Sequence, residues 1–316
     1  MSSRNVIEVR ESLGAVDRRV YTLSIPKRDK MIAILTTDEV TVLGVPRGQV
    51  KDRGQICTAI AEFFLNATDD IMPNFLIATD DDGQLPPNVM LGEYCEPIPV
   101  KFIARRYLTG SLYEEYTNND GVTSWGKLED GLPRYHQFKE LMLTPMLRIT
   151  TGEYEPITED EIISMGVMKP ADLWYAREKC VELYTRGEFF ASKAGLTLAD
   201  TKFEFGWNVH GGMVLIDELL TPDCSRYWQS QEAAFSDENP PKAETSSEHL
   251  SAWVRQQAAK HDMPTDDVVV PSRVRREAYF TYAEIYRQLL ETTFSPIKPP
   301  RDVVRALKTY VANNFE

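Results

Sequence analysis

The pattern of apolar and polar residues predicts mainly strands in the first hundred residues. Short alternating or β-branched runs, bounded by turn residues, indicate five strands at Val20–Ser24, Met31–Thr37, Val40–Val45, Asn74–Thr79 and Pro99–Arg105. Apolar residues at helical spacing predict one helix over Gln55–Asn66. Beyond Leu112 this spacing dominates and predicts the helices Thr158–Met165, Ala171–Ala194, Thr245–His261, Arg273–Glu291 and Asp302–Asn313.

Two of these helices have a recognisable start signal. Thr158 with Glu161, and Thr245 with Glu248, have the spacing of a capping box. A sheet-rich first region joined to a mixed second region is a common way to enclose a nucleotide in a cleft. We therefore expect two lobes, residues 1–98 and residues 99–316.

The segment Leu198–Trp228 carries the most informative chemistry. Asp200, Lys202 and Glu204 alternate with apolar residues, so a strand points all three side chains to one face. The opposite face, which carries Phe203, is expected to belong to the core. The sequence thus predicts a strand with one charged face and one buried face.

A hairpin turn follows this strand. Asn208–Gly212 supplies turn residues, and Met213–Asp217 returns as a second strand. A fold about His210 and Gly211 brings Glu204 nearly opposite Asp217. Two carboxylates that close repel each other unless a proton or a cation lies between them. Because Mg²⁺ binds one or two carboxylates together with substrate phosphates, the hairpin predicts a metal–nucleotide site.

Charged residues on one strand face are also typical of the solvent-facing side of a sheet. The segment Thr221–Arg226 favours the metal–nucleotide interpretation, because it adds a hydroxyl, a carboxylate and a guanidinium close to the paired carboxylates. A second group of polar residues lies in Pro99–Ser111, where Arg105 and Ser111 are placed to bind phosphate oxygens. The alternative for Arg105 is a surface salt bridge, which is a common arrangement.

Composition narrows the range of partners. The formal net charge of −13 argues against nucleic acid and against an anionic membrane, both of which need dense Lys and Arg. The chain has no transmembrane run and no signal-peptide pattern, and its four scattered cysteines indicate reduced thiols in the cytoplasm. Four histidines without close pairing make a zinc site improbable. Small-molecule substrates are expected, and a homo-oligomer is left open.

The motifs together resemble those of the SAICAR synthetase (phosphoribosylaminoimidazole-succinocarboxamide synthase) family. Residues 200–206 match the family's D-x-K-x-E-F-G in full. Residues 99–111 match P-x-E-x-[IV]-x-R-x-x-x-T-G-S, except that Lys101 replaces the Glu. Residues 217–228 are similar to D-E…T-P-D-S-S-R-[FY]-W, with Cys224 in place of one Ser. The resemblance covers most of the chain.

The resemblance implies a role for each matched residue. Glu204 and Asp217 would hold Mg²⁺ beside the ATP phosphates, and Lys202 would neutralise charge near the transferred phosphate. The 5′-phosphate of the ribotide and its surroundings would be bound by Arg105, Ser111, Arg226, Ser225 and Asp200. The nucleotide would be bound by Arg18, Glu218 and the backbone around Glu96–Pro99, which would form the interlobe hinge against adenine.

The resemblance also implies the fold and the reaction. The fold is α+β, with an antiparallel-sheet ATP lobe (1–98) and a mixed α+β lobe for substrate and metal (99–316). ATP would phosphorylate the carboxylate of carboxyaminoimidazole ribotide, and the amine of aspartate would then displace phosphate to form an amide. Two alternatives remain: the same chemistry on another ribotide or amine in specialised nucleoside biosynthesis, and a catalytically silent nucleotide-binding homologue.

Some positions depart from the family pattern. The family's Gly-Lys pair in the phosphate loop is Ala15 and Val16 here. Where the family has T-P-x-T-K followed by D-E, this chain has Arg148 for the Lys and Tyr154 for the Asp. Changing a charge in a polar pocket alters which ligand groups can be satisfied there.

Overall fold

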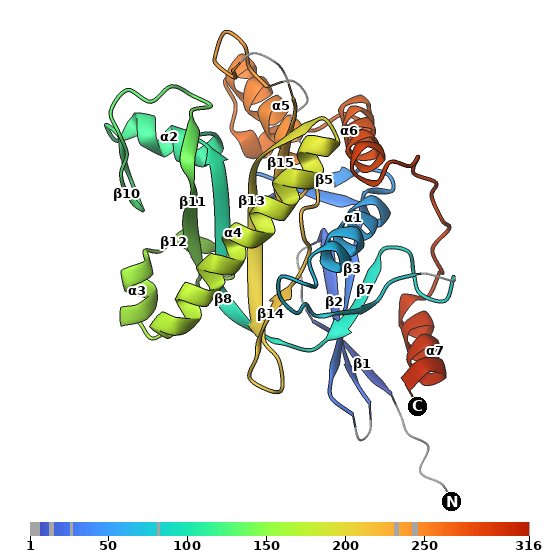
Figure 1. Ribbon diagram of the computed structural model, residues 1–316. Coiled ribbons are helices and arrows are strands. Elements are labelled where there is room, and N and C mark those ends of the chain that lie inside the picture. Colours follow the sequence, from blue (N-terminus) through green and yellow to red (C-terminus); the bar gives the residue numbers. More distant parts are fainter. Residues whose placement is uncertain are drawn as a thin grey trace, which may run out of the picture.

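The computed structural model describes residues 7–12, 16–25, 28–80, 83–230, 234–241 and 246–315, with side chains in the last range from His249. The fold is α+β and contains two main antiparallel sheets, each covered by helices (Figure 1). No helix in these ranges is both long enough and apolar enough to cross a membrane.

The first sheet is built from the N-terminal part of the chain. Its strand order is β1 (Glu8–Ser12), β2 (Arg18–Ser24), β3 (Met31–Thr36), β7 (Val89–Glu93) and β6 (Leu76–Ala78). Helix α1 (Arg53–Ala67) covers one face and the C-terminal helix α7 (Val303–Phe315) covers the other (Figure 1). A separate two-stranded sheet pairs β4 (Glu39–Val42) with β5 (Val45–Gln49).

The second sheet has six strands. Their order is β12 (Tyr154–Pro156), β11 (Gln137–Arg148), β8 (Glu96–Tyr107), β13 (Leu196–Trp207) and β14 (Met213–Ile216), and β15 (Ser225–Gln229) also pairs with β13. The long helix α4 (Pro170–Lys193) crosses one face of this sheet (Figure 1), where Phe102, Phe203 and Phe205 enter the core. The remaining elements are α2 (Gly110–Asn118), β9 (Val122–Thr123), β10 (Gly126–Lys127), α3 (Glu159–Ser164), α5 (Ser246–His261), the 3₁₀ helix η1 (Thr265–Asp267) and α6 (Ser272–Leu290).

Local signals in the sequence located several of these elements. The hairpin of β13 and β14 forms with Gly211 in the left-handed region at φ 78°. The capping box at the start of α3 is complete, because Thr158 and Glu161 each accept a hydrogen bond from the other's backbone N–H. Thr245, at the second capping box that the sequence predicts, lies outside the described residues.

Other strand predictions were wrong or incomplete. The single strand expected over Val40–Val45 is a hairpin, because Leu43 and Gly44 adopt φ values of 53° and 79° and reverse the chain. The sequence analysis missed the strands β1, β7, β9, β10, β11, β12 and β15. Strand β11 lacks a regular alternation of buried and exposed residues, since its register with β8 shifts between Gln137 and Met142.

The boundary between lobes at residues 98 and 99 remains a prediction. The first sheet ends at Glu93 and β8 begins at Glu96, so Tyr94 and Cys95 connect the two sheets. Helix α7, which the sequence prediction assigned to the second lobe, packs against the first sheet through Leu307 and Val311.

Candidate active site

One face of the six-stranded sheet gathers the charged residues that the sequence singled out. Directly paired residues on adjacent antiparallel strands point to the same face. The pairs between β8 and β13 on this face are Arg105 with Asp200, Ile103 with Lys202, and Lys101 with Glu204. Because the opposite face is filled by aromatic residues under α4, we call the charged side the substrate face.

The hairpin brings the two predicted metal-binding carboxylates together. Glu204 pairs with Ile216, so Asp217 lies one residue beyond the position opposite Glu204. Asp217 adopts φ 70°, a left-handed conformation that Asp tolerates better than most residues, and this ends β14. Burial, together with the charge of Asp217, raises the pKa of Glu204. The two side chains therefore interact as an acidic pair.

Cations surround this pair. One guanidinium nitrogen of Arg18 donates to Asp217, and Arg18 Nη2 lies 2.7 Å from Glu218 Oε1. Lys202 Nζ lies 3.6 Å from the same oxygen of Glu218. The hydroxyl of Thr221 donates to the other oxygen of Glu218. Arg18, from the first sheet, thus joins the carboxylates of the second.

The charges in this cluster set its protonation state. Burial raises the pKa of Glu218, but the charges of Arg18 and Lys202 outweigh this effect and hold the pKa at about 2. Burial alone would lower the pKa of Lys202, but the Glu218 carboxylate raises it above its ordinary value. Glu218 is therefore ionised and Lys202 is protonated near neutral pH.

A second cluster lies further along the substrate face. Arg105 Nη1 lies 3.4 Å from Asp200 Oδ2, and Arg105 Nε donates to Thr144 Oγ1 at 3.0 Å. Arg226 donates to the same oxygen of Asp200. Burial lowers the pKa of Arg105 to about 10, and the nearby Arg226 also lowers it. One carboxylate thus holds two guanidinium groups, which is a suitable arrangement for binding a phosphate dianion.

The start of α2 completes this second cluster. Gly110 has φ 58°, and a Cβ atom built on it would lie 2.7 Å from Arg226 Nη2. A side chain at residue 110 would therefore displace the guanidinium of Arg226, and the positive φ itself favours glycine. Ser111 follows in the first turn of α2 and is exposed. The sequence predicted Arg105, Arg226 and Ser111 as one phosphate-binding set, and the structure brings their elements together.

Ser225, one of the predicted substrate-binding residues, lies on the interior side of β15. It pairs with Thr201, whose side chain points away from the substrate face. The two hydroxyl oxygens lie 2.8 Å apart, and Ser225 is only 4% exposed. Alternation along β15 sends Arg226 to the substrate face and Ser225 to the interior. Ser225 therefore joins β15 to β13, and its predicted part in substrate binding stays a prediction.

Glu96 and Pro99, the predicted hinge residues, lie within β8. Glu96 pairs with Trp207, and its carboxylate accepts a hydrogen bond of 3.2 Å from the Tyr94 hydroxyl. The chain crosses between the sheets at Tyr94 and Cys95, one residue before the predicted position. Both predicted residues are exposed.

Sequence reasoning missed a buried network that joins α1, α6 and the loop before β15. Arg53 Nη2 lies 2.7 Å from Asp223 Oδ2, and the Tyr282 hydroxyl donates to the other oxygen. The Cys57 thiol also donates to Asp223 Oδ2, at 3.2 Å. Arg53 donates in addition to the carbonyl oxygen of Thr37 at 2.7 Å. In the sequence, the T-P-D motif that contains Asp223 was the signal that could have pointed to this network.

A second feature that the sequence prediction did not assign is the contact between Lys101 and Tyr154, beside Glu204. Lys101 Nζ sits 3.4 Å from the centroid of the Tyr154 ring. Burial, together with the charge of Lys202, lowers the pKa of Lys101 to about 8. Burial and the nearby Glu204 raise the pKa of Tyr154 to about 12. Both residues stand where the family pattern has acids.

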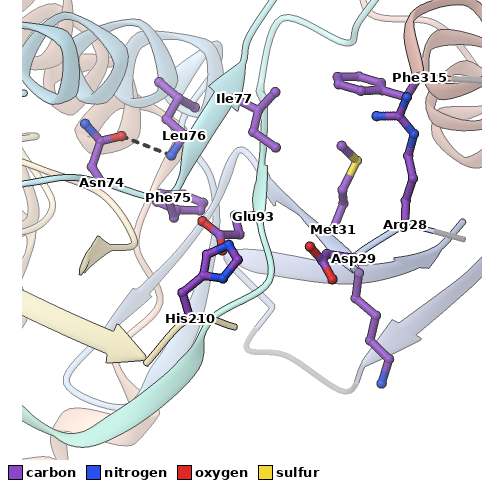
Figure 2. A pocket seen from close by; sticks show the side chains of 11 residues that line it. Arg28, Asp29, Met31, Asn74, Phe75, Leu76, Ile77, Glu93, His210 and Phe315 are labelled. Atoms are coloured by element: carbon purple, nitrogen blue, oxygen red, sulfur yellow. Dashed lines mark hydrogen bonds between the residues drawn. The ribbon is translucent and has the colours of Figure 1, made fainter. Parts of the chain in front are cut away.

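A separate cavity of about 710 Å³ lies at the turn end of the hairpin (Figure 2). His210, from the turn, and Glu93, from the end of β7, line it together with Phe315 of α7. Asn74 Oδ1 accepts a 3.0 Å hydrogen bond from the backbone N–H of Leu76 at its edge. None of the residues that the sequence assigned to catalysis or binding lines this cavity.

Within the described ranges, no group of three or more His, Cys, Asp or Glu side chains is arranged to hold a metal ion. A two-carboxylate site such as Glu204 with Asp217 therefore suits only an ion whose other ligands come from water or substrate. Mg²⁺ bound with nucleotide phosphates fits that requirement.

Comparison with known proteins finds relatives that match most of this chain. The family model for SAICAR synthetase matches residues 15–265. The phosphoribosylaminoimidazole-succinocarboxamide synthase of Flavobacterium psychrophilum is 31% identical over 286 residues, covering 88% of this chain and 86% of that protein. The enzyme of that name from Azobacteroides pseudotrichonymphae is 32% identical over 277 residues, covering 87% and 81%.

Solved structures show the same fold. The SAICAR synthase of Saccharomyces cerevisiae, complexed with SAICAR, has a TM-score of 0.73 at 23% identity and covers 91% of this chain and 97% of its own. The fold and the matched relatives together define an ATP-dependent ligase. More specifically, the chain belongs to the SAICAR synthetase family.

Proposed function

We propose that the protein forms an amide between the carboxylate of carboxyaminoimidazole ribotide and the amine of aspartate, with ATP converted to ADP and phosphate. The observation that carries this proposal is the acidic pair Glu204 and Asp217, set beside Lys202 and Arg18 and next to the phosphate-binding cluster. The named activity of the matched relatives supports it. So do related structures that hold SAICAR and ADP.

The reaction has two steps. A carboxylate oxygen of the ribotide attacks the γ-phosphorus, and the bond to the ADP oxygen breaks, giving an acyl phosphate. The aspartate nitrogen then attacks the acyl carbon and loses a proton, and the bond to the phosphate oxygen breaks. Such transfers depend on positioning and on stabilising phosphoryl charge more than on a strong base.

Residues of this chain supply those effects. The ammonium of Lys202 and the guanidinium of Arg18 face the position expected for the transferred phosphoryl group. Arg105 and Arg226, held by Asp200, bind the ribotide 5′-phosphate and fix the distance of its carboxylate from Glu204. A Mg²⁺ ion held by Glu204 and Asp217 would neutralise charge on the triphosphate. The raised pKa of Glu204 supports this assignment, because it reflects an acidic pair that a cation would stabilise.

Residues of the first sheet and the connection to β8 complete the proposal. Arg18 and Glu218 lie on the nucleotide side, and Glu96 and Pro99 lie near the crossing between sheets, against which adenine would pack. We place the reaction in the cytoplasm, because all four cysteines are free and buried, as expected for a reducing compartment.

The direct test is incubation with ATP, Mg²⁺, carboxyaminoimidazole ribotide and a panel of amines, with ADP and product measured by mass spectrometry. We expect ADP release with aspartate and the succinocarboxamide as product. ADP release with a different amine alone would favour another nucleoside pathway. Tight ATP binding without ADP release from any amine would favour a silent homologue.

The metal role is tested by Glu204→Gln. We expect turnover to fall by at least about 100-fold, as when a transition-state contact is removed, while ribotide binding is largely retained. Glu284→Gln is the matched control, because Glu284 is an exposed residue of α6 whose carboxylate pairs with Arg287. Full activity of the Glu204 variant would refute the metal role.

A further inference from the structure

Two cations on the substrate face have no carboxylate partner. Lys101 and Arg148 are not within 4.0 Å of any carboxylate oxygen of the described residues, whereas Lys202, Arg18, Arg105 and Arg226 each have one. Lys101 is only partly exposed and its ammonium rests against the Tyr154 ring. The charges of Glu204 and Asp217 attract Lys101 only from beyond 4.0 Å, and burial still lowers its pKa, so an anion that binds close to Lys101 would recover free energy. Arg148 is exposed and free to turn toward the same anion.

The strand register places these groups together. Met146 pairs with Lys101, and Tyr154 pairs with Arg148, two residues further along β11. Residues two apart on a strand point to the same face, so Lys101, Arg148 and Tyr154 share the substrate face with Glu204. From the spacing of strands and residues, the Cα atoms of Lys101 and Arg148 lie about 8 Å apart. Long side chains from these positions reach one shared ligand.

The anions of the reaction can be assigned by elimination. The ribotide phosphate takes the Arg105 and Arg226 cluster, and the triphosphate takes Lys202 and Arg18. The ribotide carboxylate loses its own charge when it becomes an acyl phosphate, and the phosphoryl group that it gains is the one already assigned to Lys202 and Arg18. The carboxylates of the incoming amino acid are the anions left without a cation.

We propose that Lys101, Arg148 and Tyr154 form the subsite that binds the carboxylate groups of the amino acid beside Glu204. This inference rests on the proposed function. Arg148 binds a carboxylate in a bidentate manner, Lys101 supplies a second charge, and the Tyr154 hydroxyl donates a hydrogen bond. Lys101 and Tyr154 stand at positions where the family pattern quoted above has acidic residues.

The test is steady-state kinetics of Lys101→Met and Arg148→Met with each substrate varied in turn. Loss of one charge-assisted hydrogen bond predicts a rise in the aspartate KM of roughly 10- to 100-fold. We expect kcat to change by less than about 3-fold, because these residues bind substrate equally before and in the transition state. The KM values for ATP and ribotide should stay the same.

Three comparisons separate binding from a structural effect. Lys101→Arg should restore the aspartate KM to within a few-fold of wild type, because the charge is kept. Lys101→Met should lose most of its preference for aspartate over asparagine. Lys308→Met is the matched control, since Lys308 is an exposed residue of α7 on the first sheet.

Some results would overturn this inference while leaving the proposed function intact. An unchanged aspartate KM in both Met variants, with the wild type active on aspartate, excludes the subsite. An equal rise in all three KM values shows a structural role instead. An inactive wild type would refute the proposed function itself. ADP release by the wild type is therefore measured before any variant is tested.

Discussion

Replacing Asp223 by Asn should strongly destabilise the protein. The Asp223 carboxylate forms an ion pair with Arg53 at 2.7 Å and accepts hydrogen bonds from the Tyr282 hydroxyl and the Cys57 thiol. The side chains of Arg53 and Asp223 are only 6% and 10% exposed. Burial would lower the pKa of Arg53, but Asp223 raises it well above its ordinary value, so Arg53 stays charged. The Asn variant leaves that buried charge with only the more distant and more exposed carboxylate of Asp17, 4.0 Å away, among the described residues.

The expected magnitude follows from the burial of this pair. Removing one partner of a buried ion pair costs about 3–5 kcal/mol. For a chain of this size, each kcal/mol lowers Tm by about 2–4 °C, so the shift is on the order of 10 °C. The network ties α1 to α6 and to the loop before β15, so the loss should affect the whole cooperative unit.

The assay is thermal unfolding followed by circular dichroism, with urea unfolding as a second measure. Asp70→Asn is the control, because Asp70 pairs with Arg186 at 2.9 Å but is 63% exposed. An exposed pair contributes only about 0–1 kcal/mol, so this variant should shift Tm by a few degrees at most. Equal Tm shifts in the two variants would refute the reasoning, since burial would then have no effect.

Three other changes have distinct expected results. Gly110→Ala should raise the ribotide KM about 10-fold or more, because the added Cβ displaces Arg226. Gly166→Ala is the control, at a similar φ of 71° with open space around it, and equal ribotide KM values in the two variants would contradict the steric argument. Ser225→Ala should lower the free energy of unfolding by about 1–3 kcal/mol, because the buried Thr201 hydroxyl loses its partner. The ribotide KM should stay unchanged, and a large rise in this KM would instead support a role of Ser225 in substrate binding. Burial raises the pKa of all four cysteine thiols, so the native protein at pH 8 should resist iodoacetamide and react fully only in denaturant. Labelling is measured by mass spectrometry, and rapid labelling of the native protein would contradict this expectation.

Much of the candidate site could be predicted from local sequence. The alternation over Asp200–Glu204 is enough to place three charged side chains on one strand face, because side-chain direction has a period of two. The turn residues of Asn208–Gly212 then fix the approach of Asp217 to Glu204. The capping box at Thr158 is equally local. In each case the interacting residues are close in sequence.

Other parts of the site could not be predicted in this way. Ser225 and Arg226 are neighbours in one motif, yet alternation sends only Arg226 to the substrate face, and the phase of β15 depends on its pairing with β13. The ion pairs of Arg18 depend on how the first sheet packs against the second. The network around Asp223 joins residues from three elements distant in the chain.

The sequence by itself therefore determined the family, the charged strand face and the acidic hairpin, because short-range periodicity and turn chemistry decide these features. Tertiary structure alone decided which cations meet which carboxylates and which are left without one. The physical reason is that an ion pair depends on strand register and on the packing of distant elements, and neither is written in any single stretch of residues. Lys101 shows this most clearly, since only the register of β8 with β11 and β13 sets its ammonium among Glu204, Arg148 and Tyr154.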